Sequence, residues 1–303
     1  MATQSSVATL EPKQEQQYRS ESLFTKAIRR LSRDYLTLGA MAVVLLFTLL
    51  AAFGPWINQN ILHVNPDTTS SNTFAPYGTD GHILGTDDIG RDQLARLLVA
   101  GQVSLGIGFA GATISLSIGM FLGVMTGYFG GIVDDILNWI ITTLDSIPSL
   151  YLLILISAIF RPDAASLIFA IALISWTGTT RIIRGQTLAI RNLDYILSAQ
   201  ALGASPWRIM ASHIIPNLIS ITAIVLMRAI GGLMLTEAGL SFLGLGVQPP
   251  QATWGNMLTK AQSFFTLGPH LIWPPGLAIS ITVLCLYIIG DGIRDAFDPT
   301  STK

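Results

Sequence analysis

Residues 197–216 read LSAQALGASPWRIMASHIIP and form a short polar interruption between two long apolar runs of the chain. Tyr195, Ala199 and Leu202 recur at the spacing of an α-helix, which predicts a short helix with one shallow apolar face. Gly203 follows and is predicted to end that helix, because a left-handed residue costs least at glycine. The segment carries no catalytic group, so a docking role is favoured over a chemical one.

A second short helix is predicted directly after this glycine. Ser205 can act as the N-cap, and Pro206 suits the first helical position. Pro216 is predicted to close the segment, because a proline pushes the residue before it, Ile215, away from helical angles. Two small helices between apolar runs predict a knob, residues 195–216, that docks into a groove on a soluble partner.

The composition indicates a membrane protein. Of the 303 residues, 50% are hydrophobic and only 12% are charged, and the mean hydropathy is +0.56. Soluble domains carry about twice that share of charge. Apolar runs of about 20 residues predict transmembrane helices, and therefore an all-α polytopic membrane protein. The six runs are 35–57, 103–127, 138–160, 165–185, 217–238 and 273–290.

Basic residues fall unequally on the two sides of these runs. Twelve lie on the side of the two termini and the knob, and four lie on the other side. An excess of positive charge marks the cytoplasm, so both termini and the knob are predicted to be cytoplasmic. The domain plan is a tail (1–34), a first transmembrane helix (35–57), an extracytoplasmic loop with an amphipathic helix (58–100) and a five-helix core with a short cytoplasmic tail (101–303).

Four stretches resemble a known family. Gly203 and Pro216 have the spacing of the coupling motif of ATP-binding-cassette importer permeases, with Leu197-Ser-Ala in place of Glu-Ala-Ala. Residues 84–92 (LGTDDIGRD), 240–250 (LSFLGLGVQPP, followed by Trp254-Gly255) and 290–299 (GDGIRDAFDP) resemble the C-type permease subunit of dipeptide and oligopeptide importers. The resemblance extends over residues 25–300.

The resemblance implies a type I importer permease with a cytoplasmic coupling helix, in a bacterial inner membrane. The implied partners are a B-type permease, two ATPase subunits, an extracytoplasmic solute-binding protein and membrane lipid, with no nucleic acid. ATP and Mg would be held by the ATPases, and this chain would bind no cofactor and catalyse no reaction. Peptides are the implied substrates, with nickel chelates, glutathione or another small solute as alternatives. The implied ATPase-coupling residues are Ala199, Gln200, Leu202, Gly203, Ala204, Ser205 and Pro216.

The second apolar run carries a small residue at every fourth position. These residues are Gly111, Ser115, Gly119, Gly123 and Gly127. Such a stripe lets another helix approach closely, as helices do in lipid. It predicts packing against a neighbouring span of this chain or of a partner, and a flexible hinge is the alternative.

Charged residues inside the predicted spans are candidates for lining the translocation path, because charges at bilayer depth are costly and functional by default. The candidates are Arg228, Asp145 and Glu237, and the last lies near the outer end of its span. Arg228 is expected to pair with Asp145 or with backbone carbonyls, or else to line the path and meet substrate carboxylates. Asp145 is expected to be a buried structural acid near Pro148.

Residues 84–92 are expected just outside the membrane, before an amphipathic helix from Asp92 to Ala100 with Thr86 or Asp87 as its cap. The aspartates lack the spacing of a calcium loop, so a capped surface element or a docking site for a binding protein is favoured over a metal site. Residues 240–250 predict a re-entrant turn at the outer mouth. The candidate docking or outer-gate residues are Asp87, Arg91, Asp92, Leu243, Gly244, Gln248 and Trp254.

Other activities lack their motifs in this sequence. No Gly-x-x-x-x-Gly-Lys-Ser/Thr loop occurs, and the four histidines form no His-Glu-x-x-His pattern. An ion-driven secondary transporter would be expected to show inverted repeats and paired broken helices with midplane acids. That class, and a non-transporting membrane scaffold, are the alternatives to an ATP-driven importer.

Overall fold

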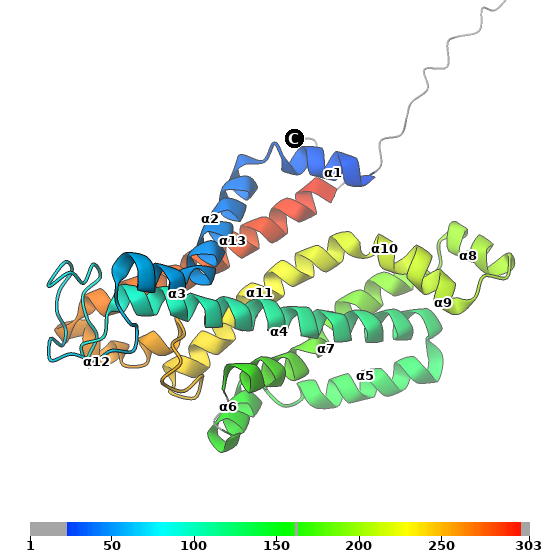
Figure 1. The fold of residues 1–303 in the computed structure, drawn as a ribbon. Coiled ribbons are helices and arrows are strands. Elements are labelled where there is room, and N and C mark those ends of the chain that lie inside the picture. Colours follow the sequence, from blue (N-terminus) through cyan, green and yellow to red (C-terminus); the bar gives the residue numbers. More distant parts are fainter. Residues whose placement is uncertain (1–22, 161–162, 298–303) are drawn as a thin grey trace, which may run out of the picture.

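The computed structural model describes residues 23–160 and 163–297, and every regular element in those ranges is a helix. Five helices are long and apolar enough to cross a bilayer, and a bent pair, α5 and α6, is a sixth candidate (Figure 1). The predicted all-α polytopic fold class is confirmed. The five are α2 (Tyr35–Ala52), α4 (Gln93–Phe129), α7 (Ala164–Ile190), α11 (Ile219–Phe242) and α13 (Trp273–Phe297), and the bent pair is α5 (Gly131–Asp145) and α6 (Ser149–Phe160).

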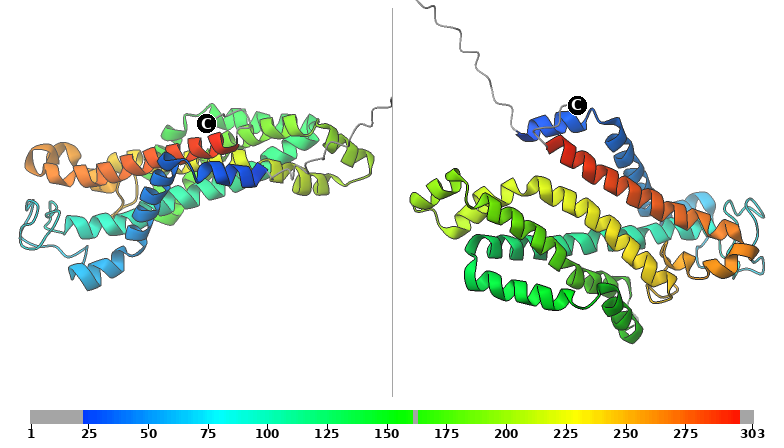
Figure 2. Two further views of the ribbon diagram at one scale, coloured as in Figure 1. Left: turned by 90° about the horizontal axis from the view of Figure 1, so that it is seen from above. Right: turned by 180° about the vertical axis from the view of Figure 1, so that it is seen from behind.

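The short helices gather at the two ends of this bundle, and Figure 2 shows the same separation from two further sides. One end, at the right of Figure 1, consists of α8 (Asp194–Ala201), α9 (Pro206–Ile209), the π-helix η2 (Met210–Ile214) and α10 (Ile215–Asn217). The opposite end holds the loops around residues 63–92 and 243–260. Beside them lie α3 (Gly54–Ile57), η1 (Asn58–Leu62), η3 (Asn256–Leu258), α12 (Ala261–Leu267) and η4 (Pro269–Leu271), while α1 (Leu23–Leu31) packs on α13.

Helix α4 runs between the two ends and is longer than a single membrane crossing requires. Its 37 residues span about 55 Å, against about 30 Å for the hydrocarbon core of a bilayer. The prediction of a separate amphipathic helix up to Ala100 is wrong, because that stretch is the first part of α4. Its cap is Asp92, whose carboxylate accepts from the backbone N–H of Ala95 at 2.7 Å, and not Thr86 or Asp87.

The small-residue stripe of α4 packs against α7. A Cβ at Gly119, Gly123 or Gly127 would stand 2.6–2.8 Å from side-chain carbons of α7, and the three facing residues are Thr179, Ile183 and Thr187. Gly111, at the other end of the stripe, faces Leu233 of α11 at 3.1 Å. The predicted close packing is confirmed, and the neighbouring helices belong to this chain.

The third predicted span is broken. Residues 138–160 were expected to form one helix, but α5 ends at Asp145 and α6 begins at Ser149, with a bend of 70° between them. Pro148 disfavours helical angles at Ile147 and supplies no N–H for the ladder, which explains the break.

Two apolar cores hold the bundle together. The larger lies between α2, α4, α7, α11 and α13, and it includes Ile107, Ile171, Met234 and the buried Cys285. The smaller lies where the ends of α4 and α7 meet the knob. It contains Val124, Ile183, Ile196, Ile209, Met210, Ile214 and Leu218. The knob is therefore fastened to the spans by its own buried face.

Candidate functional site

The two helices of the knob are capped as predicted. Gly203 takes φ +80°, and the backbone N–H of Ala204 donates to the carbonyl of Ala199 at 3.0 Å, which closes the end of α8. Ser205 is the N-cap of α9, and its hydroxyl accepts from the N–H of Arg208 at 3.4 Å. Pro206 stands at the first helical position. These local signals were sufficient because each acts within five residues.

The apolar face of α8 differs from the predicted one. Tyr195 and Leu202 point outward, and the residue that α8 buries is Ile196, which is 0% exposed. Leu202 is 89% exposed and Trp207 is 60% exposed, so the tip of the knob presents large apolar side chains to its surroundings. Leu202 is one of the predicted ATPase-coupling residues, and its exposure leaves it available to a partner.

Pro216 does not close the segment. Ile215 keeps helical angles (φ −54°, ψ −45°), and Pro216 lies inside α10. The preceding five residues form η2, a π-helix. Such a wider turn relieves the clash between a proline ring and the carbonyl four residues earlier. The knob is consequently joined to α11 through almost continuous helix, with a brief irregularity at Leu218.

Polar contacts tie the knob region to the ends of the spans. The guanidinium of Arg191 donates to the carbonyls of Gly127 and Tyr128 at 3.0 and 3.3 Å, at the end of α4. Arg184 on α7 forms a two-fold ion pair with Asp134 on α5. Sequence reasoning placed these arginines on the cytoplasmic side but gave them no partners, because the partners lie more than 45 positions away in the chain.

Arg228 does not pair with Asp145. It lies 2.8 Å from Asp291 on α13, and the two side chains are 54% and 62% exposed. Asp145 instead pairs with Arg181 of α7 at 2.7 Å and accepts from the hydroxyl of Thr177. Asp145 is also one-third exposed, so it is not the buried acid that was expected. The structure therefore separates two residues that the sequence suggested as partners.

Glu237 is a buried acid and does not line an open surface. It is 1% exposed, and its Oε1 accepts hydrogen bonds from Ser241 and Thr253, each at 2.7 Å. Thr253 belongs to the segment that folds back after α11. This segment begins later than predicted, because α11 continues to Phe242 and includes the first residues of the expected re-entrant turn.

Trp254 anchors the same segment on α4. Its indole N–H donates to the carbonyl of Leu97 at 3.0 Å, and its backbone N–H donates to the hydroxyl of Ser104 at 2.9 Å. A Cβ at Gly101 would lie 3.0 Å from the indole ring, so glycine makes room for it. Residues 252–255 are thus buried against α4, whereas residues 248–251, just before them, are exposed.

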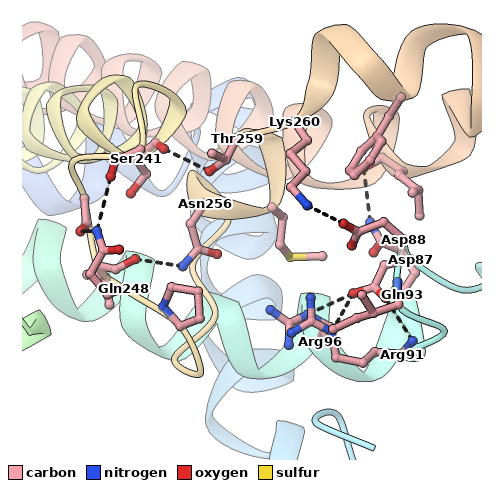
Figure 3. A pocket seen from close by; sticks show the side chains of 18 residues that line it. Asp87, Asp88, Arg91, Gln93, Arg96, Ser241, Gln248, Asn256, Thr259 and Lys260 are labelled. Atoms are coloured by element: carbon pink, nitrogen blue, oxygen red, sulfur yellow. Dashed lines mark hydrogen bonds and ion pairs between the residues drawn. The ribbon is translucent and has the colours of Figure 1, made fainter. Parts of the chain in front are cut away.

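A pocket of about 440 Å³ opens at the end of the bundle opposite the knob, between the start of α4 and the folded-back segment (Figure 3). Four candidate outer-gate residues line it: Asp87, Arg91, Gly244 and Gln248. Within its wall Arg91 pairs with Asp87 at 2.6 Å, and Lys260 pairs with Asp88 at 2.7 Å.

The other three outer-gate candidates are elsewhere. Asp92 caps α4 and lies 2.7 Å from the ring nitrogen of His82, Trp254 is buried, and Leu243 is exposed beside the pocket without lining it. The sequence missed Arg96 and Lys260 as pocket residues, because neither lies in a recognised motif. In the described part of the chain, no group of three or more potential metal ligands comes together.

Comparison with known proteins identifies the family. Residues 119–303 match the family model of the binding-protein-dependent transport system inner membrane component. The chain belongs to this family. Residues 22–80 match the N-terminal TM domain of oligopeptide transport permease C, so the resemblance inferred from the four sequence stretches is confirmed. The chain is thus a multi-pass permease subunit of the inner membrane, and not an ion-driven transporter or a scaffold.

Three relatives resemble the permease over nearly its whole length. The oligopeptide transport system permease protein OppC of Haemophilus influenzae is 34% identical over 287 residues, which cover 94% of this chain and 91% of the relative. The glutathione transport system permease protein GsiD of Pectobacterium atrosepticum is 36% identical, with 89% of each chain covered. The dipeptide transport system permease protein DppC of Alkalihalophilus pseudofirmus is 33% identical, with 95% and 93% covered.

Proposed function

We propose that this permease imports peptides across the inner membrane, together with a B-type permease, two ATPase subunits and an extracytoplasmic binding protein. Relatives named for oligopeptide and dipeptide transport, at 33–34% identity over more than nine-tenths of the chain, support the substrate class. The ATPases would hold ATP and Mg, and this chain supplies the path and the mechanical link, without a cofactor and without catalysis of its own.

The observation that carries the proposal is the exposed apolar tip of the knob. Leu202 and Trp207 project from helices whose opposite face is locked into the smaller core. Fully burying a leucine side chain stabilises a contact by about 1.5–3 kcal/mol, so an ATPase groove that covers Leu202 gains a substantial share of its binding energy there. Short helices inserted into apolar grooves are a recurrent form of recognition.

The rigid attachment of the knob suggests how ATP use moves the spans. When two ATPases close around ATP, the knob is displaced with them, because its outward side chains are held in the ATPase groove. Ile196, Ile209 and Ile214 transmit that displacement to the ends of α4 and α7, and α10 transmits it to α11. Such a rigid-body change between two packed states alternately opens the path to either side.

The proposed orientation places the knob and both termini in the cytoplasm. The excess of basic residues on that side supports it. The packing of α1 on the C-terminal part of α13 also supports it, since Gly292 on α13 lies against Thr37 at the start of α2 and both ends of the described chain thus share one side.

The test replaces the exposed leucine of the knob in the complete complex. Leu202→Asp is expected to reduce co-purification of the ATPases and peptide uptake into proteoliposomes by at least about tenfold, since 1.4 kcal/mol of lost contact corresponds to a factor of ten. Leu267→Asp is the matched control, because Leu267 is also an exposed leucine of a short helix but lies at the outer end. Full uptake by the Leu202→Asp complex would refute the docking role of the knob.

Glutathione is a second candidate substrate, because the relative at 36% identity carries glutathione in its name. The two candidates are separated by competition, with labelled dipeptide uptake measured against an excess of unlabelled glutathione. Inhibition by glutathione together with uptake of labelled glutathione would assign the permease to the second substrate.

A further inference from the structure

Arg96, near the start of α4, is a buried cation with few partners. The residue is 5% exposed. Its Nη1 donates to Asp67 at 3.3 Å, and its Nε lies 3.8 Å from Asp87, beyond hydrogen-bonding distance. A guanidinium carries five N–H donors, so in the described chain most of the donor capacity of Arg96 is unused. Desolvating a charge without pairing it is costly, which indicates that something else meets this side chain.

Asp87 and Asp67 leave most of the Arg96 donors without an acceptor. Asp87 already accepts from the side chain of Arg91 at 2.6 Å and from the backbone N–H groups of Ile89 and Arg91. Asp67 is more than half exposed, so its contact with Arg96 is open to competition from water.

The unused donors point into the outer pocket. Figure 3 shows the guanidinium of Arg96 directed into the space that separates α4 from Gln248 and Asn256. The pocket volume of about 440 Å³ lies within the range of small-molecule sites, about 300–1,000 Å³. Val247, Met257 and Phe264 give its wall an apolar part that would suit a side chain.

We propose that this outer pocket binds the C-terminal carboxylate of a small peptide, with Arg96 as the carboxylate ligand. A planar guanidinium and a carboxylate form two parallel charge-assisted hydrogen bonds, which satisfies the donors that Arg96 leaves unused. The inference rests on the proposed peptide substrate and adds a location to it, namely a station at the outer mouth.

The rest of the pocket suits a zwitterion. Asp88 faces the pocket from the loop before α4, and its partner Lys260 is 64% exposed at the side chain. Exposed ion pairs contribute little, about 0–1 kcal/mol, so an ammonium group can replace Lys260 beside Asp88. The carboxylate end of a peptide then lies at Arg96 and the amino end toward Asp88, with the side chains against the apolar wall.

A small solute fits this position better than an acidic side chain of a docking protein. Arg96 lies at the buried side of the pocket, whereas a docked protein meets the exposed rim formed by Gln248 and Lys260. The volume also accommodates a free dipeptide with both of its charged ends.

The test measures peptide binding to the complete permease–ATPase complex in nanodiscs, without the binding protein. The probes are L-alanyl-L-phenylalanine and its C-terminal amide, compared by saturation-transfer NMR. The free acid is expected to bind about tenfold more tightly than the amide, because only the acid forms charge-assisted hydrogen bonds with Arg96. Arg96→Gln is expected to abolish that preference, whereas Arg294→Gln, an exposed arginine of α13 remote from the pocket, leaves it unchanged.

A second variant keeps the test valid if Arg96→Gln fails to assemble. Met257→Trp fills the pocket without touching the charges, and it is expected to weaken both probes. Equal binding of acid and amide to the wild-type complex, an unchanged preference in Arg96→Gln, or undiminished binding of both probes in Met257→Trp would overturn the proposal. A preference for the acid that appears only with the binding protein docked would assign Arg96 to protein docking instead. ATP-driven uptake by the wild-type complex reports on the proposed function independently.

Discussion

Replacing Gly203 tests the coupling role of the knob, and the structure defines how much backbone strain the replacement introduces. Gly203 has φ +80°, and a Cβ built on it meets no atom of the described chain within 4 Å. The cost of a side chain is therefore backbone strain alone, roughly 1–2 kcal/mol for an L-residue in the left-handed region. A β-branched residue is least tolerant of that region, so Gly203→Val is expected at the upper end of this range.

That strain lowers the population of the native turn about 5- to 30-fold, which is enough to misplace Leu202 while the membrane core stays folded. Gly203→Val is expected to leave the complex assembled in detergent, to lower peptide uptake in proteoliposomes, and to leave ATP hydrolysis less dependent on the loaded binding protein. Gly203→Asn is expected to behave nearly as wild type, because asparagine tolerates the left-handed region better than other residues.

Gly81 provides the matched control. It has φ +85° and equally open space, but it lies in the outer loop. Gly81→Val is expected to strain its own turn by a similar amount without changing the ratio of transport to ATP hydrolysis. Wild-type coupling in an assembled Gly203→Val complex would show that the reasoning about this turn is incorrect.

Three further predictions concern packing, charge and topology. Gly123→Leu is expected to lower the Tm of the complex, because overpacking against Ile183 costs about 1–3 kcal/mol. Gly106→Leu is the control and is expected to leave the Tm unchanged, because a Cβ at Gly106 meets nothing within 4 Å. Equal Tm values for the two variants would contradict the α4–α7 packing. Arg228→Ala or Asp291→Ala alone is expected to reduce the yield of assembled complex more than the double variant does, and additive losses would exclude their coupling. In a Cys285→Ser background, an impermeant thiol reagent should label Ser71→Cys in intact cells and Ser198→Cys only in inverted vesicles; labelling of Ser198→Cys in intact cells would reverse the topology.

Features that depend on neighbours in the chain could be predicted from the sequence. The caps at Gly203 and Ser205 and the four-residue spacing of the α4 stripe are set by local geometry and helical period, and both appear in the structure. The bend before Ser149 was predictable in principle from Pro148 but was hidden by a continuous apolar composition on both sides.

Features that depend on distant residues could not be predicted. Arg228 and Asp291 are 63 positions apart, and nothing in either local sequence specifies that α11 and α13 bring them together. The outer pocket likewise joins Arg96 to Asn256, which come from opposite halves of the chain. The prediction that Pro216 ends the segment was wrong for another reason, because residues 210–214 form a π-helix that accommodates the proline.

Because α4 is one unbroken helix, the direction of each side chain at its outer end is fixed relative to the side chains at its knob end. From Arg96 in the outer pocket to Gly127, which Arg191 holds beside the knob, the helix rises about 46 Å without interruption. One residue inserted between them would turn Arg96 by about 100° and shift it by about 1.5 Å relative to the glycine stripe, aiming it away from the pocket. Length changes among relatives should therefore accumulate in the loop at 58–82 and be excluded from residues 96–127, whose exact number of residues is itself a functional property.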